Sequence, residues 1–153
     1  PWHKVPRAFE LIDFSFEITM SESCWAQFKR HRYCTIIQKG GSALATKIPP
    51  SIKKINRDKI WSDLNTQLIR LGSSLPPKLA YLSPYFRTNA SLVTILAKMN
   101  LREIYHFVRW RSAENAQWEI RDLSQLMAKQ VKNAAPQAGL WLCGKSEFPK
   151  QSS

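Results

Sequence analysis

The sequence has no apolar run long enough to cross a bilayer, and its first residues lack the pattern of a signal peptide. It also has few cysteines: Cys24, Cys34 and Cys143 are widely spaced and form no Cys-x-x-Cys pair. Thiols in this arrangement are typical of reduced side chains in the cytoplasm. We therefore expect a cytoplasmic protein without a membrane segment. Because the chain begins at Pro1 rather than methionine, a fragment of a longer protein and a processed product both stay open.

Common catalytic patterns are also absent. The sequence has no glycine-rich phosphate loop, no Gly-x-Ser-x-Gly, no His-Glu-x-x-His and no evident nucleophile triad. A histidine-based metal centre would need His3, His31 and His106, the only histidines, to meet in one place. We therefore expect no metal site.

Acidic residues are scarce. Only 11 Asp and Glu oppose 23 Lys and Arg, which gives a formal net charge of +12. Such a field attracts anions: nucleic acid, an anionic membrane face, or phosphorylated cofactors and substrates. The basic residues are spread along the chain rather than gathered in one tail. The charge therefore predicts an anionic ligand but does not distinguish between these classes.

The 153 residues, 44% of them hydrophobic, have the length and composition of one globular domain. Residues 9–19 alternate between apolar and polar and predict a strand, and β-branched content predicts another over residues 91–99. Caps and helical spacing predict helices over residues 22–31, 58–71, 77–82, 101–110 and 113–134, with Ser21 and Asn100 as N-caps, Gly72 as a C-terminal stop and a loop over 38–52. We expect an α+β single domain over residues 1–140, with an antiparallel or mixed sheet packed with helices, and a polar tail over 141–153.

A basic triplet, Arg30-His31-Arg32, ends the helix predicted from residue 22. Each guanidinium can offer a bidentate donor pair to phosphate, and helical spacing places Gln27 on the same side as Arg30. The alternative is a solvated helix end whose positive charges complement the helix dipole. Taken alone, the triplet favours this second interpretation.

Two later segments are also rich in polar and aromatic residues. After Asn100, Arg102 and His106 lie four residues apart and share one helix face, which fits a ligand site and a solvated basic stripe equally well. Arg111 follows between two predicted helices, where its side chain can reach into a cleft.

Along the chain these segments read Phe-Glu-x-x-x-Phe-x-Phe, Gln-x-x-Arg-His-Arg, Asn-Leu-Arg-Glu-x-x-His-Phe-x-x-x-Arg and Ala-Gln-Trp-Glu-Ile-Arg. This order resembles the flavin-dependent thymidylate synthases over residues 9–136. Members of that family use reduced FAD to move a one-carbon unit from methylene-tetrahydrofolate to dUMP, with NADPH as reductant. They form homotetramers whose sites are shared between subunits.

The resemblance implies roles for individual residues. The positions that match FAD-contacting residues of the family are Arg30, His31, Arg32, Asn100, Arg102 and His106. The family often has asparagine at the position of His106. Gln27 and Arg30 match positions that touch the uracil nucleotide. Arg111 matches the catalytic arginine thought to hold the uracil ring and favour its ionised form, a role that suits a permanently charged side chain.

The chain departs from the family after the triplet. Gln38 stands where the family has Glu, and Gly40 and Ser42 stand where it has the Ser and Arg of its dUMP-binding loop. An arginine that binds the dUMP phosphate has no clear match, and Tyr81 lies nearest to its position. Two lost charge-assisted contacts, each worth about 1.5–3 kcal/mol, would lower nucleotide affinity about a hundredfold or more.

The N-terminal portion of the family domain is also missing, so we expect a neighbouring domain or chain to complete the fold. The sequence is compatible with three functions, which can be tested. The first is a flavoprotein that acts on dUMP or a related pyrimidine nucleotide. The second is an inactive homologous domain that serves as a structural partner, and the third is a basic module that binds nucleic acid.

Overall fold

A computed structural model describes residues 5–40, 45–145 and 147. The chain divides into two compact units. The first comprises Pro1–Glu17, Gln27–Ile37 and Leu96–Ser153, and the second comprises Ile18–Ala26 and Gln38–Ile95. Both units are discontinuous in sequence, because every strand of the sheet contributes residues to each of them.

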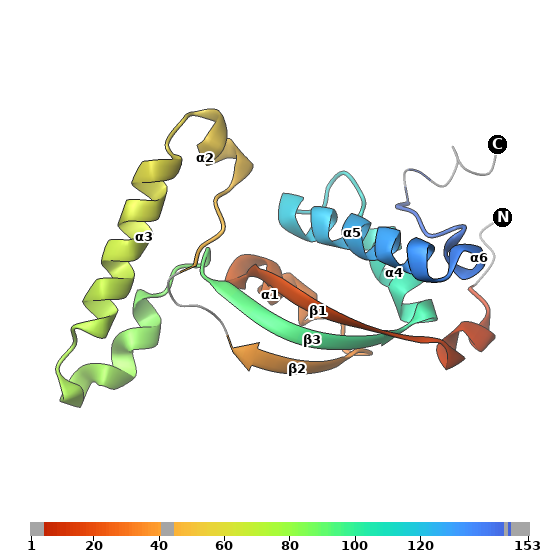
Figure 1. The fold of residues 1–153 in the computed structure, drawn as a ribbon, viewed down its shortest axis with the longest axis horizontal. Helices are drawn as coiled ribbons and strands as arrows, with labels where there is room; N and C mark the ends of the chain where they lie inside the picture. The colour runs from red at the N-terminus through yellow and green to blue at the C-terminus, as the bar shows by residue number, and fades with distance from the viewer. Residues whose placement is uncertain (1–4, 41–44, 146, 148–153) are drawn as a thin grey trace. The chain divides into compact units, whose positions relative to one another are not determined.

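The sheet is antiparallel and has the strand order β1-β3-β2 (Figure 1). Its strands are β1 (Asp13–Ser21), β2 (Thr35–Gly40) and β3 (Leu92–Asn100). Alternate residues of central β3 are buried on one face: Val93, Ile95, Ala97 and Met99. On the other face, Lys98 Nζ lies 2.8 Å from Asp13 Oδ2, and the hydroxyls of Thr19 and Thr94 are hydrogen-bonded at 3.0 Å. The period-two alternation therefore sets the register of β1 against β3.

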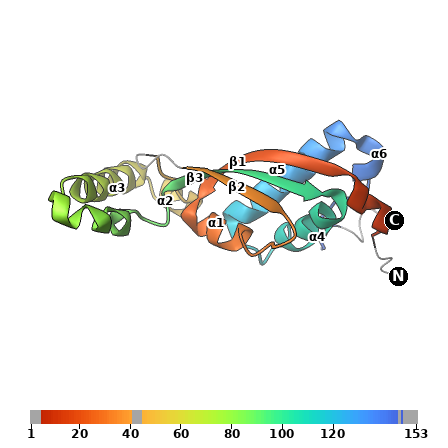
Figure 2. The same ribbon diagram turned by 90° about the horizontal axis from the view of Figure 1, so that it is seen from below.

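The first unit also holds η1 (Arg7–Leu11), α4 (Leu101–Arg111), α5 (Trp118–Ala134) and α6 (Pro136–Gly139). Within this unit α5 lies over one face of the strands and packs against α4 (Figures 1 and 2). The core of the unit contains fully buried side chains from three parts of the sequence: Phe28, Met99, Ile104, Phe107, Ile120 and Val131. α4 starts directly after β3, where the backbone N–H of Leu101 donates to the carbonyl of Ile12 at 2.7 Å.

The second unit holds α2 (Pro50–Lys54), α3 (Asp58–Ser73) and η2 (Pro77–Phe86), and α1 (Glu22–Phe28) begins in it. α3 packs against η2. A Cβ atom on Gly72 would lie only 2.8 Å from Cβ of Phe86 and 3.2 Å from the carbonyl oxygen of Ser83. The glycine therefore permits the close approach of η2 to α3.

The α+β fold predicted from the sequence is confirmed. β3 and α4 follow the predicted bounds within one residue, and both predicted N-caps are present. Ser21 Oγ accepts a hydrogen bond from the backbone N–H of Cys24 at 3.1 Å, and Asn100 Oδ1 accepts from the N–H of Glu103 at 2.8 Å. These features depend on residues close in sequence, which explains why they could be predicted.

Several bounds were predicted wrongly, and a close contact or a helix cap explains two of them. Residues 9–11 belong to η1 rather than to a strand, α1 ends at Phe28, and β2 and α2 occupy parts of the expected loop. α3 continues through Gly72 because η2 packs there. η2 extends past the predicted end at residue 82 and contains Pro84. α5 begins at Trp118 rather than at residue 113, because the Gln117 side chain caps it there by accepting hydrogen bonds from the N–H groups of residues 119 and 120. The division at residue 140 stays a prediction.

Candidate functional site

His31 is the centre of a polar network inside the first unit. Its Nε2 accepts a hydrogen bond from Nε of Arg111 at 3.0 Å, and its Nδ1 lies 3.6 Å from Oε1 of Glu103. The side chains of His31 and Glu103 are only 10% and 9% exposed. The ring of Phe107 meets the imidazole edge to face, with centroids 4.9 Å apart. Packing therefore holds the imidazole between a cation and an anion.

This geometry fixes where the imidazole carries its proton. The Nε–H of an arginine can only donate, because the guanidinium stays protonated in proteins. Nε2 of His31 must therefore present its lone pair to Arg111, and the ring proton lies on Nδ1, facing the Glu103 carboxylate. The two terminal amino groups of Arg111 make no hydrogen bond with any described residue and are available to a ligand. They can donate in parallel to a planar or anionic acceptor.

The arrangement separates the members of the basic triplet. Arg30 and Arg32 are exposed and lie on either side of the inward-facing His31. Their side chains form no ion pair with the described part of the chain. Arg30 belongs to the turn after α1, where its N–H donates to the carbonyl of Gln27 at 3.4 Å. Two unpaired guanidiniums at one turn form a cationic surface that can bind phosphate.

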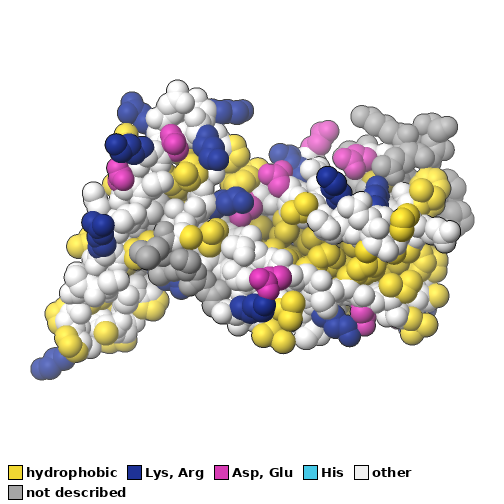
Figure 3. Space-filling view, in the orientation of Figure 1, with side chains coloured by type: hydrophobic (Ala, Val, Ile, Leu, Met, Phe, Trp, Pro, Cys, Tyr) yellow, Lys and Arg dark blue, Asp and Glu magenta, His cyan; other side chains and the backbone are white. Residues whose placement is uncertain are grey.

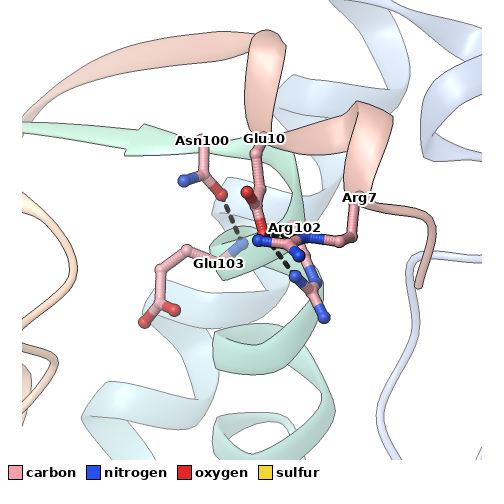
Figure 4. A network of polar contacts seen from close by, with 5 residues as sticks. All are labelled: Arg7, Glu10, Asn100, Arg102 and Glu103. Carbon is pink, nitrogen blue, oxygen red and sulfur yellow. Dashed lines mark hydrogen bonds and ion pairs between the residues drawn. The ribbon is translucent and has the colours of Figure 1, made fainter. Parts of the chain in front are cut away.

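Asn100 and Arg102 lie at the N-terminus of α4 (Figure 4). The Asn100 side chain is used as the N-cap, while Arg102 forms a charge-assisted hydrogen bond with Glu10. Nε of Arg7 lies 3.9 Å from the same Glu10 carboxylate oxygen. The Arg102 and Glu10 side chains are more than a third exposed, so the pair contributes at most about 1 kcal/mol. A bound phosphate could therefore compete with Glu10 for Arg102.

His106 and Gln27 stand at the edge of this site. His106 is exposed on α4, and its ring centroid lies 6.5 Å from that of His31. Gln27 is half-buried near the end of α1. Among the predicted site residues, His31 therefore contacts Arg111 and His106 directly. The described contacts include none between the His31 side chain and the side chains of the other predicted residues nearby, which are Gln27, Arg30, Arg32 and Arg102.

Cys34 lies beside the network. Its thiol donates a hydrogen bond to the carbonyl oxygen of His31 at 2.8 Å. Burial, and then the negative charge of Glu103, raises the pKa of the Cys34 thiol above its ordinary value. The thiol is therefore protonated near neutral pH and is a poor nucleophile.

Sequence reasoning did not assign roles to Glu103 and Glu10, which partner His31 and Arg102. The spacing of Asn100 and Glu103 is that of an N-cap followed by an acidic residue three positions later, which is a signal for a helix start. It gave no indication that the Glu103 side chain points toward His31. Glu10 is 92 residues from Arg102, so no local pattern could have joined them.

The positions that depart from the family lie in the second unit. Gln38 is exposed on β2, Gly40 is the last residue of that strand, and Tyr81 is exposed on η2. Ser42 lies outside the described residues.

No group of three or more metal-ligating side chains occurs among the described residues, to which His3 does not belong. A cavity of about 260 Å³ in the first unit is lined by α4, α5 and the following chain, and it contains none of the predicted site residues. Within residues 5–40, 45–145 and 147, no helix has the length and hydropathy to span a bilayer.

Comparison of the sequence with known proteins identifies a family. The family model described as thymidylate synthase complementing protein matches residues 2–137. The flavin-dependent thymidylate synthase of Clostridium tetani is 30% identical over 159 residues, an alignment that covers 88% of this chain and 63% of that protein. The enzyme of the same name from Pyrococcus abyssi is 29% identical over 136 residues, with 80% and 55% covered.

A further relative is the UPF0159 protein Ta1429 of Thermoplasma acidophilum, which is 24% identical over 136 residues; 87% of this chain and 27% of that protein are covered. The chain thus spans less than two thirds of the length of each of these three relatives. The family model nevertheless matches far more than half of the chain. The chain therefore belongs to the family of thymidylate synthase complementing proteins, and the predicted resemblance to flavin-dependent thymidylate synthases is confirmed.

Proposed function

We propose that the chain acts in flavin-dependent thymidylate synthesis, binding FAD and a pyrimidine nucleotide of the dUMP type at the site around His31. The observation that supports this most is the 3.0 Å hydrogen bond between Arg111 and His31, two side chains 80 residues apart. The resemblance assigns one of them to the nucleotide and the other to the flavin. Their contact would place the two ligands side by side.

The residues present fit an anionic cofactor. Arg30 and Arg32 are exposed cations without an ion-pair partner among the described residues, and Arg102 is held only by a partly exposed pair. These guanidiniums would bind the FAD pyrophosphate. When bound and reduced, FAD supplies the reducing equivalents for forming the methyl group. Asn100 would contribute through its role as the cap that fixes the start of α4, and His106 would lie beside the flavin.

Arg111 would hold the uracil ring. Nε of Arg111 donates a hydrogen bond to His31, and this bond fixes the orientation of the guanidinium. The two terminal amino groups can then donate to a carbonyl of the uracil ring and to the adjacent ring nitrogen. A fixed cation at this position favours the ionised form of the ring. Gln27 and Arg30 would complete the nucleotide contacts.

The same proposal includes methylene-tetrahydrofolate as one-carbon donor, NADPH as reductant, and a homotetramer with shared sites in the cytoplasm. The altered positions Gln38, Gly40 and Ser42 would weaken nucleotide binding relative to the family. A second candidate function, an inactive domain that supports an active partner, rests on these altered positions.

FAD binding is the first test. The purified chain is titrated with FAD, and the quenching of flavin fluorescence gives the dissociation constant. Replacing both Arg30 and Arg32 by Gln should raise that constant about a hundredfold, since each loses a charge-assisted contact worth about 1.5–3 kcal/mol. A matched control with the same charge change, Lys53→Gln with Arg57→Gln, should leave it unchanged. A wild-type chain that does not bind FAD would refute the proposal.

Turnover separates the two candidate functions. The chain is incubated with dUMP, methylene-tetrahydrofolate, FAD and NADPH, and dTMP is measured by chromatography. Formation of dTMP by this chain alone would rule out the inactive domain. FAD binding without dTMP, alongside retained association, would favour it.

A further inference from the structure

α4, α5 and the chain that follows α6 line a cavity of about 260 Å³ in the first unit. Pockets for drug-sized ligands have roughly 300–1,000 Å³, and a water molecule in the liquid takes up about 30 Å³. The cavity therefore suits a compact organic molecule rather than a few waters. On α4 it is lined by Val108 and Ser112, and it contains none of the residues that contact His31.

The buried lining residues form an apolar floor. Those that are apolar and at most 9% exposed are Val108, Ala128, Leu142 and Cys143. The hydroxyl of Ser112, which is also buried, is hydrogen-bonded to the hydroxyl of Ser124. Burial, and then the negative charge of Glu147, raises the pKa of the Cys143 thiol, so the thiol is uncharged near neutral pH. The floor therefore fits the apolar part of a ligand.

The more exposed lining residues form a polar rim, and most of them can donate hydrogen bonds. The members from α5 follow one another along one face of that helix, and they are Gln125, Lys129, Lys132 and Asn133. Figure 3 shows Lys and Arg side chains over α5 in the first unit. Neither lysine of the rim forms an ion pair with a described residue. The ammonium and amide groups are therefore available to an acceptor on a ligand.

Glu147 is the acidic member of the rim. Its carboxylate accepts a hydrogen bond from the backbone N–H of Gly144 at 3.1 Å, and its own N–H donates to the carbonyl of Gly144 at 3.0 Å. Two lysines and one glutamate give the rim a formal charge of +1. This charge balances a monoanion, whereas a phosphate ester carries close to two negative charges at neutral pH. Phosphate sites are also typically built from arginine forks or backbone N–H groups, which the rim does not have among its described residues.

We propose that this cavity binds a small organic monocarboxylate, with its apolar body against the floor and its carboxylate at Lys129 and Lys132. Lysine ammonium groups act as point charges on flexible stems, so they can accept carboxylates of different shapes. The inference goes beyond flavin and nucleotide binding, because no residue assigned to those ligands lines the cavity. Its tests use the full chain without FAD.

Benzoate and benzamide test the charge, because they have nearly the same shape and only benzoate is anionic. Each is titrated into the isotope-labelled chain, and the changes in the NMR spectrum give the dissociation constant. We expect about 1 mM for benzoate and a value at least about tenfold higher for benzamide. The largest shifts should come from the N–H groups of Leu142, Cys143 and Gly144. Shifts centred on Arg30 and Arg32, or equal constants for the two probes, would overturn the proposal.

Removal of the rim charge separates a local site from attraction by the net charge. The double variant Lys129→Gln with Lys132→Gln should weaken benzoate binding about tenfold and bring it close to that of benzamide. The matched control is Lys53→Gln with Lys54→Gln, which makes the same charge change at two exposed positions of α2 and should bind benzoate as the wild type does. Equal weakening by the two double variants would refute a site at the rim.

The thiol of Cys143 reports occupancy of the floor. In a Cys34→Ser background the other thiol, that of Cys24, is fully buried. Labelling by methyl methanethiosulfonate at mildly alkaline pH is followed by mass spectrometry. Saturating benzoate should slow the labelling of Cys143 about tenfold by mass action, whereas benzamide at the same concentration should not. Ser73→Cys in the same background adds an exposed thiol on α3, whose labelling benzoate should leave unchanged. A Cys143 rate that does not respond to benzoate would exclude this cavity as the site.

Discussion

Arg111 donates a hydrogen bond from Nε to Nε2 of His31, and this one contact orients both side chains. It fixes the imidazole with its proton toward Glu103, and it directs the terminal amino groups of the arginine away from His31. A lysine in place of Arg111 would have neither the Nε–H nor the planar fork.

Arg111→Lys should therefore impair ligand binding more than its unchanged charge suggests. Under the proposed function we expect dUMP affinity to fall about tenfold to a hundredfold, as for the loss of a bidentate charge-assisted contact. Calorimetric titration with dUMP measures the dissociation constant. Arg57→Lys, an exposed position in the second unit, is the control and should bind dUMP as the wild type does. Equal affinity of Arg111→Lys and wild type would remove the arginine from the nucleotide site.

Glu103→Gln should loosen the His31 ring while preserving the volume of the side chain. The neutral amide interacts less strongly with the Nδ1–H group of His31, and we expect the free energy of unfolding to fall by about 1 kcal/mol. Urea denaturation measures the change, and nitrogen NMR of His31 reports the proton position directly. Glu114→Gln, at an exposed site, should change neither. A His31 spectrum identical in the wild type and Glu103→Gln would contradict the role given to Glu103.

Asn100→Ala should destabilise the start of α4, because the N–H of Glu103 loses its acceptor at 2.8 Å. Loss of such a cap costs about 1 kcal/mol, within a range of about 0.5–2 kcal/mol. Asn100→Asp keeps a capping oxygen and should retain most of the stability. If both variants unfold at the same urea concentration, the side chain does not act as a cap.

Gly72→Ala should destabilise the second unit, although alanine normally favours a helix over glycine by about 1 kcal/mol. The new methyl group would meet Cβ of Phe86 at 2.8 Å, so η2 has to shift. Overpacking of this kind costs about 1–3 kcal/mol. Thermal unfolding followed by circular dichroism measures the net effect, with the exposed Gln67→Ala as control. A gain in stability would show that η2 moves without cost.

Alkaline pH should destabilise the chain, and three of the described side chains contribute to this effect. Burial is the main cause that raises the pKa of Cys34, Cys143 and Tyr105. Folded chains then hold these protons more tightly than unfolded chains do, so the free energy of unfolding falls as pH rises above the ordinary values, about 8.5 for a thiol and 10 for a phenol.

Cys34→Ser isolates the contribution of the thiol beside the site. Between about pH 8 and pH 10 the variant should lose less stability than the wild type, and Cys143 and Tyr105 contribute to the slope that remains. Urea denaturation at several pH values gives both slopes. Parallel slopes for the two proteins would mean that Cys34 ionises equally easily in the folded and unfolded chain.

Features that depend on near neighbours could be predicted from the amino-acid sequence. The β-branched content of residues 91–99 predicts β3, Asn100 caps α4, and the spacing of the basic and polar segments identifies the family. It also put His31 and Arg111 on the list of site residues, whose assigned roles stay predictions. Capping hydrogen bonds and β-branched content are properties of a few consecutive residues, so they can be recognised without a structure.

Contacts between side chains that are distant in sequence depend on the folded structure. It turned His31 inward to Glu103 and Arg111 while Arg30 and Arg32 stayed exposed, and it paired Arg102 with Glu10. It also placed β2 beside β3 and kept Gly72 inside α3. Each of these depends on packing between segments far apart in the chain, where contacts follow from the shape of the core rather than from local propensity. The basic triplet therefore consists of two solvent-facing cations on either side of one largely buried imidazole.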